Sequence, residues 1–129
     1  MKKVFVSVPI RGRNNTDVMN SITKMHELAE FIFGEELELI HGYWIYPSAK
    51  GNHSLYRLGQ AIIKMAEADY FIGIGYSDYF IGCNEEYGIA QRYGIPTYSV
   101  DISKVKFLKD AYDTERRHWN NPPEVQINN

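Results

Sequence analysis

Two adjacent carboxylates, Glu85 and Glu86, stand near the start of a segment that is expected to form a helix directly after a strand. In α/β proteins, ligands bind at the carboxyl ends of the strands, where the following helices begin. A carboxylate there could serve as a nucleophile or stabilise a developing positive charge. Adjacent helical residues point about 100° apart, so the two cannot serve one reaction centre equally, and the spacing does not choose between them. Acidic residues also occur in a first helical turn simply because they complement the helix macrodipole.

The position of these glutamates predicts their protonation. A carboxylate in a first helical turn is expected to have a lowered pKa and to stay ionised, which suits a nucleophile or charge stabiliser better than a general acid. Cys83 lies just before the expected helix, where the dipole could lower the pKa of its thiol and make it reactive. The alternative for Cys83 is a small packing residue.

A second candidate for chemistry is the loop after the first expected strand, with the sequence Ser7-Val8-Pro9-Ile10-Arg11-Gly12-Arg13-Asn14. Backbone amides, a flexible glycine and arginines at this place would suit a phosphate or a carboxylate. The glycine and lysine spacings of a dinucleotide fingerprint or a P-loop are absent. The alternative is an ordinary strand-to-helix turn with solvated arginines.

Other kinds of site receive little support from the residue types. The four histidines are scattered, and none has metal-ligand spacing with another histidine or a carboxylate: His26, His41, His53 and His118. With a single cysteine, an intramolecular disulfide is excluded. We therefore expect neither a metal nor a cofactor.

The apolar pattern predicts the elements that position these residues. Strands are expected at 4–8, 37–40, 70–74 and 97–100. The first helix is expected to begin after an N-cap at Asn15 or Thr16 and to end at Gly34, and further helices are expected at 54–68, 84–93 and 103–119. Alternating strands and helices predict an α/β fold, a three-layer sandwich with a parallel, flavodoxin-like or Rossmann-like sheet of four or five strands. Residues 1–119 are expected to form a single domain, followed by a loose tail at 120–129. The irregular segment 41–53 is expected to lie over the site.

Bulk composition narrows the class of protein. The chain has 129 residues, 44% hydrophobic and 23% charged, which is typical of one soluble globular domain. A formal net charge of -2 gives no global positive field for a nucleic-acid polymer. The apolar start is too short for a signal peptide, and no apolar run approaches the roughly 20 residues that span a bilayer. We expect a cytoplasmic protein that binds neither nucleic acid nor membrane.

Two motifs give the chain a family resemblance. The opening Lys3-Val4-Phe5-Val6-Ser7-Val8-Pro9-Ile10-Arg11-Gly12 and the later Glu86-Tyr87-Gly88-Ile89-Ala90, with Tyr93-Gly94-Ile95-Pro96 after it, carry the likeness. In their order and spacing they resemble the nucleoside 2-deoxyribosyltransferase-like superfamily, which includes the 2'-deoxynucleoside 5'-phosphate N-hydrolases. Ala66-Glu67-Ala68-Asp69 also fits the family's lead-in to the third strand.

The resemblance implies a function and a set of site residues. The glutamate of Glu-x-Gly-x-Ala is the family's nucleophile and maps to Glu86, which would attack C1' of a nucleoside or nucleotide and form a covalent ribosyl-enzyme. A second base would then give transfer, and water would give hydrolysis. Arg11 and Arg13 would suit a 5'-phosphate. The sugar side would be lined by Ser7, Pro9, Ile10, Arg11 and Gly12, and the other side by Asn84 with Tyr76 or Asp78.

The sequence also departs from the family pattern. Members with known chemistry usually carry an aspartate in the helix before the third strand, and the matching stretch 59–63 has no carboxylate. Asp78 lies two positions from where a second aspartate is expected. A non-catalytic nucleotide-binding or sensing module therefore remains an alternative, as does an oligomeric scaffold without a ligand. The resemblance further implies a homo-oligomer, for which Tyr43-Trp44 and the C-terminal segment are candidate contacts.

Overall fold

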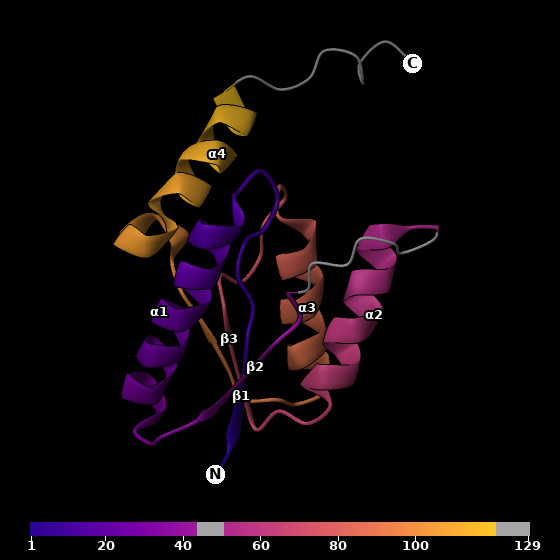
Figure 1. Cartoon of the computed structure of the whole chain (residues 1–129), viewed down its shortest axis with the longest axis vertical. Helices are drawn as coiled ribbons and strands as arrows, with labels where there is room; N and C mark the ends of the chain where they lie inside the picture. Colours follow the sequence, from indigo (N-terminus) through magenta and orange to yellow (C-terminus); the bar gives the residue numbers. More distant parts are fainter. Residues whose placement is uncertain (44–50, 121–129) are drawn as a thin grey trace.

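The computed structural model describes residues 1–43 and 51–120 and confirms the α/β class. Within that part of the chain, four parallel strands form one sheet in the order β2-β1-β3-β4 (Figure 1). The strands are β1 (Lys3–Val6), β2 (Glu38–His41), β3 (Tyr70–Gly73) and β4 (Thr97–Ser99). Helices α1 and α4 lie on one side of the sheet and α2 and α3 on the other, which makes the expected three-layer sandwich.

The helices occupy the predicted places with shifted ends. They are α1 (Asn15–Phe33), α2 (His53–Met65), α3 (Ile81–Arg92) and α4 (Lys109–Asn120), with 3-10 turns η1 (Ile102–Lys104) and η2 (Lys106–Leu108) before α4. Among these described helices none is long and apolar enough to cross a membrane. The predictions of a cover at 41–53 and a tail at 120–129 fall largely on residues outside the described ranges.

Alternation along β1 builds both halves of the core. Val4 and Val6 face the α1 layer and pack with Val18 and Ile22, whereas Phe5 faces the α2 and α3 layer, with Phe71 among its neighbours. A strand whose successive side chains are apolar on both faces must lie in the middle of a covered sheet. This explains why β1, only two residues from the N-terminus, can sit at the centre of the fold.

The direction of the chain makes the carboxyl ends of the two central strands, β1 and β3, a topological switch point. From β1 the chain crosses outward through α1 to β2, and from β3 it crosses the other way through α3 to β4. At such a switch point the two loops that leave neighbouring strands diverge and open a crevice at the carboxyl ends. The loops 7–14 and 74–80 leave β1 and β3 at this point.

Helix α3 begins earlier than predicted, and the reason is its unusual start. The predicted beginning was residue 84, whereas the helix starts at Ile81 with Phe80 as N-cap and no side-chain cap bond. Instead, the hydroxyl of Ser77 accepts a hydrogen bond from the Phe80 N–H at 2.9 Å. A sequence pattern that looks for a capping side chain at the N-cap position cannot find such a start. Gly34, by contrast, ends α1 in the left-handed conformation as predicted, with φ 72°.

The distance between α2 and the sheet is set at one glycine. Gly42 follows β2, and a Cβ built on it would lie 2.8 Å from the Cβ and 3.2 Å from the Cα of Ala61 in α2. Such contacts are shorter than van der Waals packing allows, and one of the atoms belongs to the backbone. Helix α2 therefore rests directly on the main chain at this point.

Candidate functional site

A serine and a glutamate from the two central loops meet at the carboxyl edge of the sheet. Ser7, only 2% exposed, follows β1 and donates a hydrogen bond from Oγ to Oε1 of Glu86 at 2.6 Å. Glu86 is half-buried on α3, while Glu85 beside it is exposed. A short O–H···O⁻ bond of this kind orients a carboxylate and is stronger than a bond between neutral groups. Of the two adjacent glutamates, the structure thus directs Glu86 inward.

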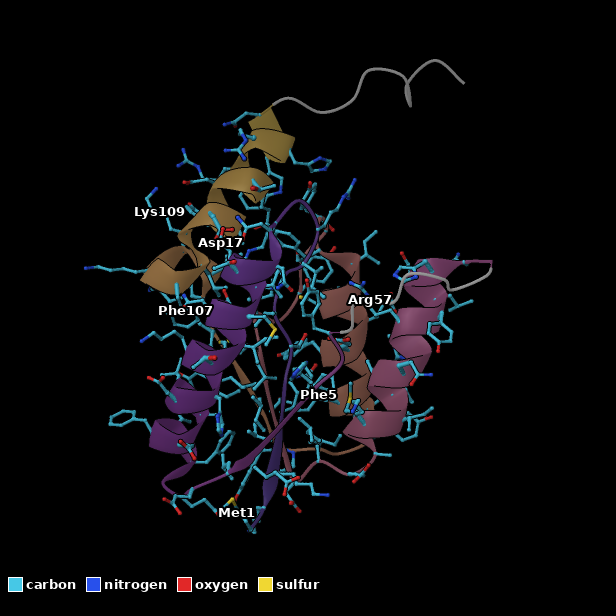
Figure 2. All side chains as sticks on the ribbon, in the orientation of Figure 1. Met1, Phe5, Asp17, Arg57, Phe107 and Lys109 are labelled. Atoms are coloured by element: carbon cyan, nitrogen blue, oxygen red, sulfur yellow. The ribbon has the colours of Figure 1, made fainter. Side chains whose placement is uncertain are left out.

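The pair lies at a cavity of about 800 Å³. Its walls come from the loop after β1, the N-terminal half of α2 and the start of α3, and Figure 2 shows Arg57 between α2 and α3. The volume lies within the range of small-molecule sites. The lining residues are Val8, Ile10, Arg11, Asn52, His53, Ser54, Leu55, Arg57, Leu58, Tyr79, Phe80, Ile81, Gly82, Cys83, Glu85 and Glu86.

The predicted low pKa of Glu86 is wrong. Burial raises the pKa of this carboxyl to about 7, although the hydrogen bond from Ser7 and the charge of Arg57 act in the opposite direction. Because α3 starts at Ile81, Glu86 lies beyond the first turn, where the macrodipole is weaker, and desolvation prevails. Near neutral pH both protonation states are populated. A charge placed in the cavity can therefore shift the balance between them.

Cys83 is a packing residue. It is buried beside Phe80 and Ala111, and burial together with the neighbouring charge of Glu86 raises the pKa of its thiol far above neutrality. The thiol is not activated by the helix dipole, because desolvation outweighs the dipole here. The interpretation of Cys83 as a small packing residue is confirmed.

Of the residues predicted in the loop after β1, some line the cavity and others face the interior of the protein or α4. Ile10 and Arg11 line the cavity, and Arg11 Nη1 donates a long hydrogen bond to the carbonyl of Tyr79 at 3.4 Å. Pro9 is buried and does not reach the cavity lining. Gly12, with φ 74°, turns the chain toward α4, where a Cβ would lie 3.6 Å from Thr114. Only part of the predicted set therefore faces the ligand space.

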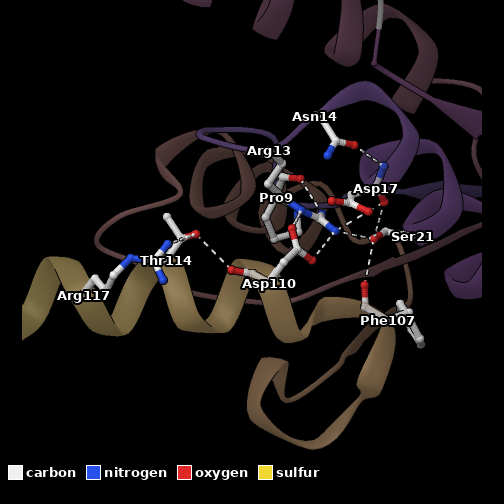
Figure 3. Close-up of polar contacts among 9 residues, drawn as sticks. All are labelled: Pro9, Arg13, Asn14, Asp17, Ser21, Phe107, Asp110, Thr114 and Arg117. Carbon is white, nitrogen blue, oxygen red and sulfur yellow. Dashed lines mark hydrogen bonds and ion pairs between the residues drawn. The ribbon is translucent and has the colours of Figure 1, made fainter.

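Arg13 is not available for a phosphate. Its side chain is 0% exposed and forms an ion pair with Asp110 of α4, with Nε 2.8 Å and Nη2 3.0 Å from the carboxylate oxygens (Figure 3). Nη1 donates to the Pro9 carbonyl at 2.9 Å and Nη2 to the hydroxyl of Ser21 at 2.6 Å. These bonds fix the loop to α1 and α4. The arginine is structural.

The predicted contacts from the loop after β3 lie elsewhere. Tyr76 donates a hydrogen bond to Asp78, and both line a second, smaller cavity of about 370 Å³ near α4, together with Ser77 and Glu115. Asn84 lines neither of these two cavities. The structure therefore does not bring these three residues together with Glu86 at one cavity.

Helix α2 contributes residues that the sequence interpretation missed. Arg57 and His53 line the cavity one turn apart, with Arg57 Nη2 3.2 Å from His53 Nε2, and the guanidinium lies 5.7 Å from the ring centre of Tyr43. Asn52 caps the helix by accepting from the Leu55 N–H at 3.0 Å. The signal was present: an N-cap asparagine followed by a cation near the helix start, on a helix that precedes a central strand.

The site holds few acids. Among the described lining residues only Glu85 and Glu86 are carboxylates, and the described part of the chain contains no group of three or more His, Cys, Asp or Glu that could hold a metal ion. What the arrangement provides is one oriented carboxylate facing two cations across a cavity. Comparison with protein-family models, with curated proteins and with solved structures finds no match.

Proposed function

We propose that this protein cleaves or transfers at the N-glycosidic bond of a nucleoside, a deoxynucleoside or its 5'-monophosphate, with Glu86 as the nucleophile. The observation that carries the proposal is the Glu86 carboxylate, held by Ser7 at the switch point of the sheet and facing a cavity of about 800 Å³. The resemblance to the nucleoside 2-deoxyribosyltransferase-like superfamily assigns the same residue independently of the geometry.

The reaction follows from the orientation of the carboxylate. Ser7 binds Oε1, which leaves Oε2 to form a bond with C1' as the C1'–N bond breaks and its electron pair leaves with the base. A proton must reach the departing base, and water or a second base then attacks C1' and releases Glu86. The transition state resembles an oxocarbenium ion, which the negative carboxylate stabilises.

The walls of the cavity suit a substrate with an anionic group. Arg11 comes from the loop after β1 and Arg57 from α2, and both line the cavity. Arginine binds phosphate oxygens through several N–H groups at once. The aliphatic and aromatic lining between them, from Ile10, Leu58 and Tyr79, suits the flat face of a base.

A second candidate function is a nucleotide-binding or sensing module without catalysis. It is favoured by the scarcity of acids at the site: the stretch 59–63 has no carboxylate, and among the described lining residues the only carboxylate besides Glu86 is the exposed Glu85. A site of this kind can bind a nucleotide while the base has no acid to protonate it on departure.

Covalent trapping separates the two functions. The protein is incubated with 2'-fluoro-substituted nucleosides and their 5'-monophosphates, and its intact mass is measured. Catalysis predicts a mass increase by one fluoroglycosyl group, lost in Glu86→Gln and kept in the matched control Glu85→Gln. An adduct that survives Glu86→Gln assigns the nucleophile elsewhere. Thermal stabilisation by a nucleotide, with neither adduct nor free base for any base tested, supports the binding module.

Assembly and location belong to the same proposal. We propose a homo-oligomer in the cytoplasm, as the resemblance implies, with Tyr43 at the edge of the described residues as one candidate contact. Light scattering at micromolar concentration tests assembly, and a monomer under these conditions contradicts it.

A further inference from the structure

Helix α4 carries a buried glutamate that reaches the loop before α3. Glu115 is only 4% exposed, and its Oε2 accepts a hydrogen bond from Ser77 Oγ at 2.5 Å. The same Ser77 oxygen accepts from the backbone N–H groups of Phe80 at 2.9 Å and Tyr79 at 3.2 Å. Phe80, the N-cap of α3, has no side-chain cap bond of its own, so the bonds to Ser77 fix the backbone that leads into the helix.

The same helix also holds the other loop. Asp110, one turn before the middle of α4, pairs with the buried side chain of Arg13, and Arg13 in turn binds the Pro9 carbonyl (Figure 3). The loop that follows Pro9 carries Ile10 and Arg11 into the cavity. Helix α4 therefore contacts, through two acidic side chains, both loops that leave the central strands.

The two loops are joined to each other as well. The guanidinium of Arg11 lies 4.3 Å from the ring centre of Tyr79, and the ring of His118 on α4 lies 4.8 Å from the same ring. Ser7 and Glu86, whose oxygens are 2.6 Å apart, belong one to each side of this junction. A displacement of either loop would change that distance.

We infer that α4 is a brace for the site and that Glu115 is a positioning residue, whose bond to Ser77 fixes the entry of α3 and thereby holds Glu86 against Ser7 in the cavity. The bond between Glu115 and Ser77 is short and buried, so water competes with it little. Glu115 itself lines the smaller cavity and not the one at Glu86, so it acts through the backbone. The inference rests on the proposed function in one respect, namely that Glu86 is the nucleophile; the positioning of its carboxylate by α4 does not depend on it.

The test reads the Glu86 carboxyl directly by 13C NMR titration of the full chain, with the signal assigned by its loss in Glu86→Gln. In the wild type, burial sets the pKa of Glu86 at about 7. If Glu115→Leu releases the entry of α3, water reaches the carboxyl and the midpoint should fall by about one pH unit or more toward its ordinary value. Glu115→Gln, which keeps an acceptor for Ser77, should restore most of the shift.

Two controls separate positioning from general loss of stability. Asp113→Asn removes an acid of the same helix that is paired with Lys109 on the surface, and Val18→Ala removes core volume on α1. Both should leave the Glu86 midpoint unchanged. A folded Glu115→Leu protein that titrates like the wild type overturns the inference. If that variant does not fold, Ser77→Ala removes the same bond, and an unmoved midpoint there overturns the inference equally.

The outcome is independent of catalysis. A shifted Glu86 midpoint in a protein that forms no glycosyl adduct supports the brace while the proposed function fails. A normal adduct with an unshifted midpoint in Glu115→Leu supports the function and overturns the brace.

Discussion

The carboxyl edge of the sheet holds two serine–glutamate pairs that differ in what surrounds them. Glu86, which Ser7 holds, lines a cavity of about 800 Å³ with two arginines in its lining, whereas Ser77 and Glu115 line a cavity of about 370 Å³ with no lysine or arginine among the described lining residues. In the first pair the serine makes one bond to the glutamate, and in the second it also gathers two backbone N–H groups. The first serine–glutamate pair thus places a carboxylate at the larger cavity, whereas the second pair fixes the backbone before α3.

The two arginines of the loop after β1 repeat this contrast. Arg13 is buried and bonded on all sides, while Arg11, two residues earlier, is exposed against the ring of Tyr79 at the cavity. Arg13, whose guanidinium is fully hydrogen-bonded, stabilises the fold. Arg11, which makes fewer bonds and lines the cavity, is the arginine that could bind a ligand. Stability and binding measurements should therefore separate the two regions.

The largest expected effect is on stability, from Arg13→Ala. The substitution leaves Asp110 without its cation and the Pro9 carbonyl and Ser21 without a donor, so it should cost about 3 kcal/mol of the free energy of unfolding. Arg11→Ala should cost less than about 1 kcal/mol, because its contacts are exposed. Urea unfolding measures both. If both substitutions lowered the free energy of unfolding equally, the structural role assigned to Arg13 alone would be contradicted.

The next effect is a pH dependence that belongs to Glu86. Its pKa is about 7 in the folded protein and 4.5 is its ordinary value, so between these values the folded state binds more protons than the unfolded state. The free energy of unfolding should therefore fall as pH rises from about 4.5 through 7, by roughly 2–3 kcal/mol for this group.

Substitution isolates that contribution. Glu86→Gln cannot ionise, so its free energy of unfolding should change less over this range and exceed that of the wild type at pH 8.5. Urea unfolding of both proteins at pH 5.5 and pH 8.5 provides the measurement, and Glu85→Gln, which removes the exposed neighbour, is the matched control. A wild-type stability that rises over this interval relative to Glu86→Gln would contradict a raised pKa.

The smallest effect compares the two serines. Ser77→Ala leaves a buried carboxylate and two backbone N–H groups without partners and should cost about 2 kcal/mol, whereas Ser7→Ala removes one bond to a half-buried carboxylate and should cost about 1 kcal/mol. Because the Ser7 bond lowers the pKa of Glu86, Ser7→Ala should also raise that pKa further. Thermal unfolding and NMR titration report the two results. If Ser7→Ala lost more stability than Ser77→Ala, the distinction between a pair at the cavity and a pair that fixes the backbone would be contradicted.

The fold could be predicted because it depends on local pattern. The apolar run at 4–8 and the helical spacing of Val18 and Ile22 fix which faces are buried, and Gly34 has a specific role at a helix end. The start of α3 could not be predicted in this way. The backbone that leads into it is held by Ser77, whose hydroxyl accepts from the Phe80 N–H and donates to Glu115, 38 positions away in the sequence.

The site was predictable in part for the same reason. The topology alone brings residues 7–14 and 81–86 to one edge, so the sequence could place Ile10, Arg11 and Glu86 together at the cavity, with Ser7 bonded to Glu86 behind it. Whether Arg11 or Arg13 faces the cavity depends on Asp110, which only the tertiary packing of α4 supplies. The pKa of Glu86 depends on how much water reaches it, which no spacing encodes. Arg57 was missed because the rule that places ligands at the carboxyl ends of strands does not point to a residue on α2.

The contact between Gly42 and Ala61 gives the cavity an adjustable width. Arg57 stands one turn before Ala61 on a helix that packs through the Ala61 methyl group directly against the main chain of Gly42, so an alanine at position 42 would force α2 or the chain after β2 to shift. A single methyl group at a position outside the cavity lining would thus move one of the cavity walls while every lining side chain is kept.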